Sequence, residues 1–420
     1  MGNYSLICCA TGGKVNLASP FNFTADCHNS LVKTQFIKPT LKIRSEFPGL
    51  WKFIDWLPVS RPNKYAFGPV TYKSKMLAKE LGLKNLWLSL NGYFPEFKAY
   101  YKTCTFKELH AVVTIEYAKE HGVDKLVLAS AGNTGVAFTF IAELLNFPIV
   151  CVIPANCMCG VNIPSMLIKH SKIIMLEDGD YSDAIDIAKR ISKVKGYVFE
   201  GGCHNFARRA GLSVPYLDAV TKIGQIPDHY FQAVGSGTGA IASWHANELF
   251  IKDGFFGNKY TKMHLSQNHP MTPMVSAWSE GRDHLIEKRD IPEDEDVINI
   301  VASRVLSTKY PAYSIGGGVY DALKATNGYM YSVKNKEIYD ALALFKKLEG
   351  PDILPASGVA LSSLMQAIRE GKVAKDDLIM LNLTGAGIIQ RHLDLSVVPI
   401  KANHTIYKDV SDEQLAELNL

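Results

Sequence analysis

Short apolar runs alternate with segments of helical periodicity along most of this chain. Runs without polar interruption are typical of strands that are buried on both faces of a parallel sheet. They predict strands at 86–90, 125–129, 148–153, 172–176, 197–200, 230–234 and 378–383. The intervening segments predict helices at 76–81, 108–120, 134–145 and 181–195. This alternation indicates the α/β class, with two doubly wound α/β domains that face each other across a cleft.

The two ends of the chain depart from this alternation. Residues 1–45 are mixed and rich in strand-forming positions, which predicts a small N-terminal β segment. Prolines and aromatic residues at 46–75 predict irregular, wrapping structure. The tail after Ile400 is expected to be peripheral. The predicted domain bounds are 46–110 together with 205–420 for a large domain, and 111–204 for a small α/β domain.

Composition excludes several classes of function. The formal net charge of +4 over 420 residues is small, and it gives no case for a nucleic acid or a membrane as partner. No apolar run reaches the ~20 residues that a membrane helix needs. Eight cysteines lack the spacing of a secreted disulfide framework, so thiols in a reducing cytoplasm are expected. Cys8, Cys9, Cys27 and His28 lack the spacing of paired zinc ligands, and no metal site is predicted.

Lys107 lies between a Thr-Cys-Thr run and the helix predicted at 108–120. The partial positive charge of a helix N-terminus disfavours an ammonium ion, so it helps to keep the lysine amine neutral and nucleophilic. Neutral lysine amines form imines with aldehydes, and pyridoxal 5′-phosphate (PLP) is the commonest carbonyl cofactor of this kind. The alternative is a solvated surface lysine, and it is the motifs further along the chain that favour a PLP site.

The first of these motifs ends one predicted strand and opens the next helix. It reads Ser130-Ala131-Gly132-Asn133-Thr134-Gly135. Backbone N–H groups at such a helix start bind anions, including the carboxylate of an amino acid. The Asn133 side chain is able to hydrogen-bond a phenolate oxygen such as O3′ of PLP. The alternative is an ordinary turn with an asparagine cap.

The second motif is a glycine-rich loop that follows the strand at 230–234. It reads Gly235-Ser236-Gly237-Thr238-Gly239. Glycines let backbone amides close around a phosphate, and the two hydroxyls add donors. The loop lacks the G-x-G-x-x-G spacing of a dinucleotide fold, because residue 240 is alanine, and it lacks the Gly-Lys-Ser/Thr of a nucleoside triphosphate site. A single phosphate is the better match.

The third motif is Thr384, which follows the last predicted strand and precedes Gly385-Ala-Gly387. A hydroxyl at the carboxyl end of a strand faces the ligand crevice of an α/β fold. Opposite a pyridine nitrogen, a threonine would leave the ring neutral, which favours β-elimination over transamination. The alternative is a threonine in a glycine turn.

Three further motifs are not assigned to the cofactor site. Cys157 and Cys159 are interpreted as buried loop thiols, and 316–318 as a turn. The run at 267–270 ends a strand near the predicted cleft, where a substrate contact and a loop role both stay open.

The four motifs, in this order, resemble PLP-dependent enzymes of fold type II, the threonine synthase and cysteine synthase superfamily. The resemblance covers about residues 60–390, and the motif sequences are most similar to those of the cysteate synthases of methanogenic archaea. It rests on the stretches 68–74, 102–109, 129–135, 227–239 and 352–355. Threonine synthases usually read Thr-Gly-Ser-Phe-Lys-Asp at the lysine. Cys104, Thr105 and Glu108 depart from that pattern and argue against threonine synthesis.

The resemblance implies a PLP-dependent transferase or lyase that converts O-phospho-L-serine and sulfite into L-cysteate and phosphate, on a route to coenzyme M. Lys107 would hold PLP and move the α-proton, and Asn133, the loop at 235–239 and Thr384 would bind the cofactor. The implied substrate contacts are Thr105, Ser130, Ala131, Gly132, Thr134, Asn205 and Arg208. The last two match a phosphate-binding segment of threonine synthases. A homo-oligomer is also expected.

Other functions stay open at this level. One is a related enzyme with another nucleophile or leaving group, such as a threonine synthase, a cysteine synthase that uses sulfide, or a β-replacement enzyme of natural-product synthesis. Another is a protein of the same fold that binds or scaffolds without turnover.

Overall fold

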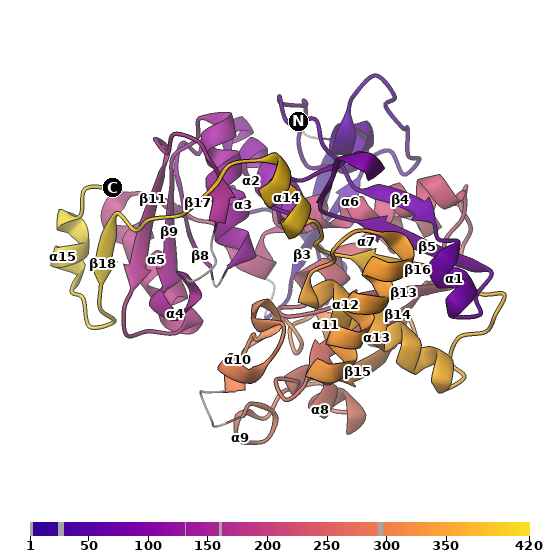
Figure 1. The fold of residues 1–420 in the computed structure, drawn as a ribbon. Coiled ribbons are helices and arrows are strands. Elements are labelled where there is room, and N and C mark those ends of the chain that lie inside the picture. The colour runs from indigo at the N-terminus through magenta and orange to yellow at the C-terminus, as the bar shows by residue number, and fades with distance from the viewer. Residues whose placement is uncertain (1–2, 24–28, 131, 159–161, 293–296) are drawn as a thin grey trace.

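The computed structural model describes residues 3–23, 29–130, 132–158, 162–292 and 297–420. Its helices and strands form two sheet-centred halves, with a third, small sheet near the N-terminus (Figure 1). Within these described ranges, no helix combines the length and the apolar character that crossing a bilayer requires.

The larger half is built on a sheet that has six strands in the described residues. Their order is β15 (Tyr329–Val333), β14 (Lys262–Asn268), β13 (His229–Ala233), β16 (Leu378–Leu383), β5 (Asn85–Leu90) and β4 (Val70–Lys73). Neighbours run parallel except β4, which pairs antiparallel with β5. Strands β13 and β16 are buried along their whole length, as central strands covered on both faces must be. The edge strand β4 corrects the prediction that 46–75 is entirely irregular.

The smaller half is built on a parallel sheet with five strands in the described residues. Their order is β12 (Val198–Phe199), β8 (Leu126–Ala129), β9 (Ile149–Pro154), β11 (Ser171–Leu176) and β18 (His404–Ile406). The predicted strands of both halves are confirmed, and the α/β fold class with them.

The C-terminal tail is not peripheral, which corrects the expectation for residues after Ile400. Strand β18 pairs with β11, and helix α15 (Asp412–Glu417) packs on α5 (Tyr181–Lys195). Ile406 and Leu415 are buried there, so burial of apolar side chains holds the tail in place. We propose that the small domain includes this tail. The predicted bounds gave all of 205–420 to the large domain.

Helices surround both sheets. Helix α13 (Pro355–Arg369) packs on β13, β14 and β16, and α6 (Phe206–Ile223) packs on β4 and β5. Helix α5 packs on β8 and β9 from one face of the sheet, and α3 (Asn133–Leu145) packs on β9 from the other face. The remaining α-helices are α1 (Met76–Glu80), α2 (Lys107–Glu120), α4 (Ala155–Met158), α7 (Thr238–Asp253), α8 (Pro273–Ser279), α9 (Glu287–Asp290), α10 (Val297–Ile300), α11 (Val319–Ala325), α12 (Asn335–Glu349) and α14 (Ile388–Asp394). Short 3₁₀ helices lie at η1 (Gly49–Trp56), η2 (Pro95–Phe97), η3 (Gly202–His204) and η4 (Arg304–Leu306).

Three small antiparallel sheets complete the described structure. The N-terminal one has the order β2 (Lys14–Val15), β1 (Tyr4–Cys8) and β3 (Val32–Phe36), which confirms an N-terminal β segment. The other two pair β6 (Tyr93–Phe94) with β7 (Ala99–Tyr100) and β10 (Asn162–Pro164) with β17 (Val397–Pro399).

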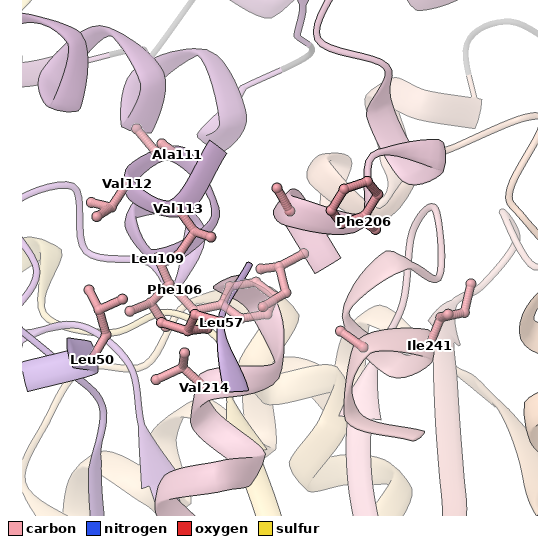
Figure 2. Close-up of a cluster of buried hydrophobic side chains, with 14 of the residues drawn as sticks. Leu50, Leu57, Phe106, Leu109, Ala111, Val112, Val113, Phe206, Val214 and Ile241 are labelled. Carbon is pink, nitrogen blue, oxygen red and sulfur yellow. The ribbon is translucent and has the colours of Figure 1, made fainter. Parts of the chain in front are cut away.

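The main hydrophobic core fixes the start of helix α2. Figure 2 shows Phe106 and Leu109 among buried side chains that include Leu50, Leu57 and Val214. Burial of each large apolar side chain contributes roughly 1.5–3 kcal/mol. Since Phe106 and Leu109 flank Lys107 in sequence, this packing holds the lysine in one place.

Candidate active site

A cavity of about 400 Å³ lies at the carboxyl ends of β8, β13 and β16. This end of a parallel α/β sheet is where ligands bind. Its lining includes the start of α2, the turn before α3, the loop before α7, the segment 302–308 and the end of β16. The predicted site residues Thr105, Lys107, Ser130, Gly132, Asn133, Thr134, Arg208, Gly235, Ser236, Gly237, Thr238, Gly239 and Thr384 all line this cavity.

Lys107 is the first residue of α2. Burial, followed by the positive charge of Arg208, lowers the pKa of Lys107 from its ordinary value to about 7. No salt bridge joins its ammonium to a carboxylate of the described residues. An amine with this pKa is partly neutral at physiological pH, which is the state that forms imines and abstracts protons.

Backbone hydrogen bonds join the turn before Lys107 to the loop that follows β16. Phe106 N donates to Thr384 O at 3.1 Å, and Ala386 N donates to Cys104 O at 3.0 Å. Phe106 also reaches the glycine loop, because a Cβ placed on Gly239 would lie 3.2 Å from Phe106 Cε2. The lysine, the hydroxyl of Thr384 and the glycine loop therefore share one wall of the cavity, as the sequence predicted.

The buried side chain of Glu108 stabilises the same turn by hydrogen bonds. Its carboxylate accepts hydrogen bonds from the Thr103 backbone and hydroxyl, and from the Tyr65 hydroxyl at 2.8 Å. Burial raises the pKa of Glu108 to about 7 despite these hydrogen bonds. Glu108 therefore positions the residues that lead into Lys107.

The turn before α3 begins with Ser130, whose hydroxyl is used within the turn. Ser130 Oγ accepts hydrogen bonds from Gly132 N at 3.1 Å and from Gly135 N at 2.7 Å. Gly132 has φ +145°, a conformation that strongly favours glycine. The Ser130 hydroxyl therefore stabilises the turn, and its contact with the substrate stays a prediction. Ala131 lies outside the described residues.

The glycine loop before α7 has no room for a side chain at Gly237. Gly237 has φ +83°, and a Cβ placed on it would lie 2.2 Å from Val319 Cγ2. The hydroxyls of Ser236 and Thr238 hydrogen-bond each other at 2.8 Å. Because the loop opens the 16-residue helix α7, its free N–H groups and the helix dipole are suited to bind a phosphate.

Arg208 enters the cavity from the first turn of α6. Its Nη1 lies 2.6 Å from Glu200 Oε2, and its Nη2 donates to Thr134 Oγ1 at 3.4 Å. Both side chains of the ion pair are almost fully buried. Arg208 therefore carries a positive charge beside the start of α3, and Glu200 balances that charge.

Asn205 does not line the cavity, which differs from its predicted role as a substrate contact. It is the N-cap of α6, where Oδ1 accepts a hydrogen bond from Arg208 N and Nδ2 donates to Glu200 O. Both polar ends are occupied by these contacts. Asn205 positions Arg208 and Glu200, a role that its place just before a helix signals.

Sequence reasoning missed the segment 302–308, Tyr181, Gln232 and 354–356, which also line the cavity. The segment 302–308 has no strand or helix period, so no local pattern signalled it.

Gln267 and Asn268 were predicted either to contact the substrate or to support a loop. In the structure they support a loop. Gln267 Oε1 accepts from Met274 N at 2.9 Å, and Asn268 Oδ1 accepts from Ser303 N at 2.9 Å.

No cluster of potential metal ligands occurs among the described residues. Cys27, His28 and Cys159 lie outside those residues, and Cys157 is half-buried in α4. The turn at 316–318 packs against the N-terminal sheet, where a Cβ placed on Gly317 would lie 2.4 Å from Cys9 Cβ.

The residues of the cavity fit PLP. Lys107 supplies an amine of lowered pKa, the glycine loop supplies backbone N–H groups at positions where a side chain would collide with its neighbours, and Thr384 lies at the end of β16. No carboxylate lines the described part of the cavity, so an anionic cofactor and anionic substrates meet no like charge there.

Comparison with known proteins agrees with this fit. Residues 68–385 match the family model described as pyridoxal-phosphate dependent enzyme. The chain is 42% identical to the cysteate synthase of Methanosarcina acetivorans over 421 residues, which covers 100% of both chains. It is 44% identical to the cysteate synthase of Methanocella arvoryzae over 390 residues, 92% of each chain.

Solved structures show the same fold at lower identity. Maize serine racemase superposes with a TM-score of 0.57 and 16% identity, covering 77% of this chain and 92% of the racemase. A threonine deaminase from T.th. gives a TM-score of 0.55 and 15% identity, with 75% of this chain and 92% of the deaminase covered. The chain therefore belongs to the pyridoxal-phosphate dependent enzyme family of fold type II, and within it to the group of the archaeal cysteate synthases.

Proposed function

We propose that this PLP-dependent enzyme catalyses β-replacement, in which O-phospho-L-serine and sulfite give L-cysteate and phosphate. The curated relatives, named cysteate synthases over nearly the full chain, support the reaction. The observation that carries the proposal is a lysine amine of pKa about 7 in a cavity whose described lining includes cations and no carboxylate.

PLP, when bound, supplies an aldehyde for the amino group of the substrate and a ring that withdraws electrons from the α-carbon. Lys107 would hold the cofactor, with the loop at 235–239 around its phosphate. Asn133 would donate to the ring hydroxyl, and Thr384 would face the ring nitrogen. A neutral hydroxyl there leaves the ring unprotonated, which favours loss of the β-substituent.

The substrate is oriented by the chain's own charges. The N–H groups at the start of α3, with Thr134, would bind the α-carboxylate. Arg208 contacts Thr134 and would face the departing phosphate, while Glu200 keeps the guanidinium in place. Thr105, whose backbone pairs with Gly385, would complete this wall of the site.

Lys107, released when the amino group of the substrate takes its place on the cofactor, would carry the proton transfers. Its neutral amine would remove the α-proton of the substrate, after which the bond between the β-carbon and the phosphate oxygen breaks and phosphate leaves with the electron pair. The sulfur lone pair of sulfite would then form the new bond to the β-carbon. The Lys107 ammonium returns the proton to the α-carbon, so that atoms and charges balance.

Product identification tests this function. Purified protein with PLP is incubated with O-phospho-L-serine and either sulfite or sulfide, and the products are identified by mass spectrometry. We expect L-cysteate and one equivalent of phosphate with sulfite. Cysteine from sulfide without cysteate from sulfite would instead support the cysteine synthase alternative.

We further propose a place on a route to coenzyme M, a cytoplasmic location and a homo-oligomer, as the resemblance to cysteate synthases implies. Support for the cytoplasm comes from the free thiols of Cys9, Cys104, Cys151, Cys157 and Cys203.

A further inference from the structure

Three cationic side chains line the described part of the cavity: Lys107, Arg208 and Arg304. Lys107 is assigned to the cofactor, and Arg208 is paired with Glu200 at 2.6 Å. Arg304 forms no salt bridge with a carboxylate of the described residues, and its Nη2 donates a hydrogen bond to Asn299 O at 3.2 Å. Its guanidinium therefore has donors that the described protein does not use.

The segment that carries Arg304 spans the cavity from the α3 turn to the glycine loop. A Cβ placed on Gly132 would lie 3.5 Å from Val305 Cγ1. A Cβ placed on Gly235 would lie 3.1 Å from both Leu306 Cα and Thr308 Oγ1. Arg304 thus precedes the point where the segment meets the α3 turn, at which the substrate's carboxylate is proposed to bind.

Two asparagines fix the backbone that leads into Arg304. Asn335 Oδ1 accepts a hydrogen bond from Ala302 N at 3.0 Å, and Asn268 Oδ1 accepts one from Ser303 N at 2.9 Å. Asn268 Nδ2 also donates to Asn335 Oδ1 at 3.0 Å, so the two side chains act together. The exposed Arg304 side chain therefore extends from a fixed point on the large half.

Ser303, next to Arg304, has a hydroxyl without a partner among the described residues. Ser303 is 2% exposed and lines the cavity, and its Oγ is among the buried side-chain atoms that lack a hydrogen bond. A buried hydroxyl left unpaired costs about 1–3 kcal/mol, so a ligand that pairs with it gains that amount back. Ser303 and Arg304 both line the cavity, so a hydroxyl and a guanidinium come from neighbouring residues of its wall.

We propose that Arg304, with the Ser303 hydroxyl beside it, binds the incoming sulfur oxyanion and so selects sulfite as the nucleophile; this assignment rests on the function proposed above. A planar guanidinium matches the oxygens of an oxyanion through paired N–H donors. Binding through oxygen leaves the sulfur lone pair directed at the β-carbon. Sulfide has no oxygens to hold, so the same residues give it no comparable advantage.

The variants Arg304→Gln and Arg304→Lys test the assignment, with Arg61→Gln as the matched control. Arg61 is an exposed arginine outside the cavity lining, so its loss changes the net charge equally. The PLP absorbance of each variant confirms that the cofactor site is intact. Two quantities are measured: KM for sulfite and for O-phospho-L-serine, and Kd for inorganic sulfate, an unreactive oxyanion, by calorimetry on the PLP-loaded enzyme.

For Arg304→Gln we expect KM for sulfite and Kd for sulfate to rise at least tenfold, because a charge-assisted hydrogen bond is lost. KM for O-phospho-L-serine should stay within twofold. Arg304→Lys should fall between the wild type and Arg304→Gln, and Arg61→Gln should match the wild type. Ser303→Ala should raise KM for sulfite by a few fold.

The outcomes separate this assignment from the proposed function. If the wild type makes cysteate and KM for sulfite in Arg304→Gln stays within twofold, the function stands and the Arg304 assignment is overturned. Equal increases in both KM values also overturn it. If the wild type makes no cysteate but Arg304→Gln loses sulfate binding, an oxyanion site is supported while sulfite as its substrate is overturned.

Discussion

Lys309 Nζ lies 3.0 Å from Asp180 Oδ2, and this ion pair joins the residue that follows the cavity segment 302–308 to the residue that precedes α5. Asp180 is also the N-cap of α5, where it accepts hydrogen bonds from Ser182 N and Asp183 N. Burial would raise the pKa of Asp180, but the hydrogen bonds from Lys309 and from α5 outweigh it and lower that pKa. The pair therefore links the two walls of the cavity next to Tyr181.

Removing this link should affect catalysis more than stability. Because the Asp180 carboxylate is 40% exposed, Lys309→Met should change the free energy of unfolding by no more than about 1 kcal/mol. KM for both substrates should rise about threefold or more, since the ion pair that holds the segment 302–308 next to α5 is lost. Lys336→Met, which breaks an exposed pair with Asp340 on α12, is the control for both measurements. Unchanged kinetic constants in Lys309→Met would show that the pair plays no part in shaping the cavity.

The glycines at the two ends of α7 both have positive φ, so an alanine at either position strains the backbone similarly. Comparing the two alanine variants therefore tests the phosphate cradle. Gly237 at the N-terminus and Gly254 at the C-terminus have φ +83° and +76°. A Cβ would lie 2.2 Å from Val319 Cγ2 at Gly237, whereas nothing lies within 4 Å at Gly254. Gly237→Ala should weaken PLP binding at least tenfold, as measured by titration of the apoenzyme. Gly254→Ala should cost about 1 kcal/mol of stability and leave PLP affinity unchanged. Equal PLP affinities in the two variants would contradict a cradle at 235–239.

The lowered pKa of Lys107 predicts how reconstitution with PLP depends on pH. Below about pH 7 the amine is protonated and cannot attack the cofactor's aldehyde. The rate at which the apoenzyme gains the absorbance of bound PLP should therefore rise between pH 6 and 8 and then level off. A rate that keeps rising towards pH 10, as for an ordinary lysine, would contradict burial of this amine.

The same pKa also predicts a change in stability of the apoenzyme. Burial, then Arg208, lowers the pKa of Lys107 from 10.5 to about 7 on folding, so between these values the unfolded chain binds one more proton. The contribution of Lys107 to the free energy of unfolding must therefore rise with pH across this window. Apo Lys107→Met should be more stable than the apo wild type at pH 7, and the difference should shrink by pH 9.5. Urea denaturation at the two pH values measures it, and a difference independent of pH would rule the shift out.

Much of this architecture was predictable from local pattern. The runs that became β8, β9, β13 and β16 are buried along their whole length and are mostly apolar, so they are recognisable as strands. The lysine, the two anion-binding turns and Thr384 were predictable because each follows a strand or opens a helix. Such positions meet at one end of a parallel sheet.

The remaining features depend on contacts between distant residues. Strand β18 forms only because the edge of β11 is available, more than 200 positions earlier in the chain. The segment 302–308 has no period, and the side chains of Asn268 and Asn335 hold it by hydrogen bonds. Ser130 and Asn205 are of the residue types that bind substrates, yet their polar atoms hydrogen-bond to neighbouring backbone groups. Sequence alone could not distinguish these two uses of one side chain.

The proposed function requires Lys107 to carry PLP in the cavity between the two halves. Borohydride reduction of the PLP-loaded protein, followed by proteolysis and mass spectrometry, identifies the lysine that holds the cofactor. We expect a pyridoxyl phosphate group on the Lys107 Nζ, and no such adduct in Lys107→Ala. A stable adduct on another lysine, or none on Lys107 in protein that shows bound PLP, would contradict it.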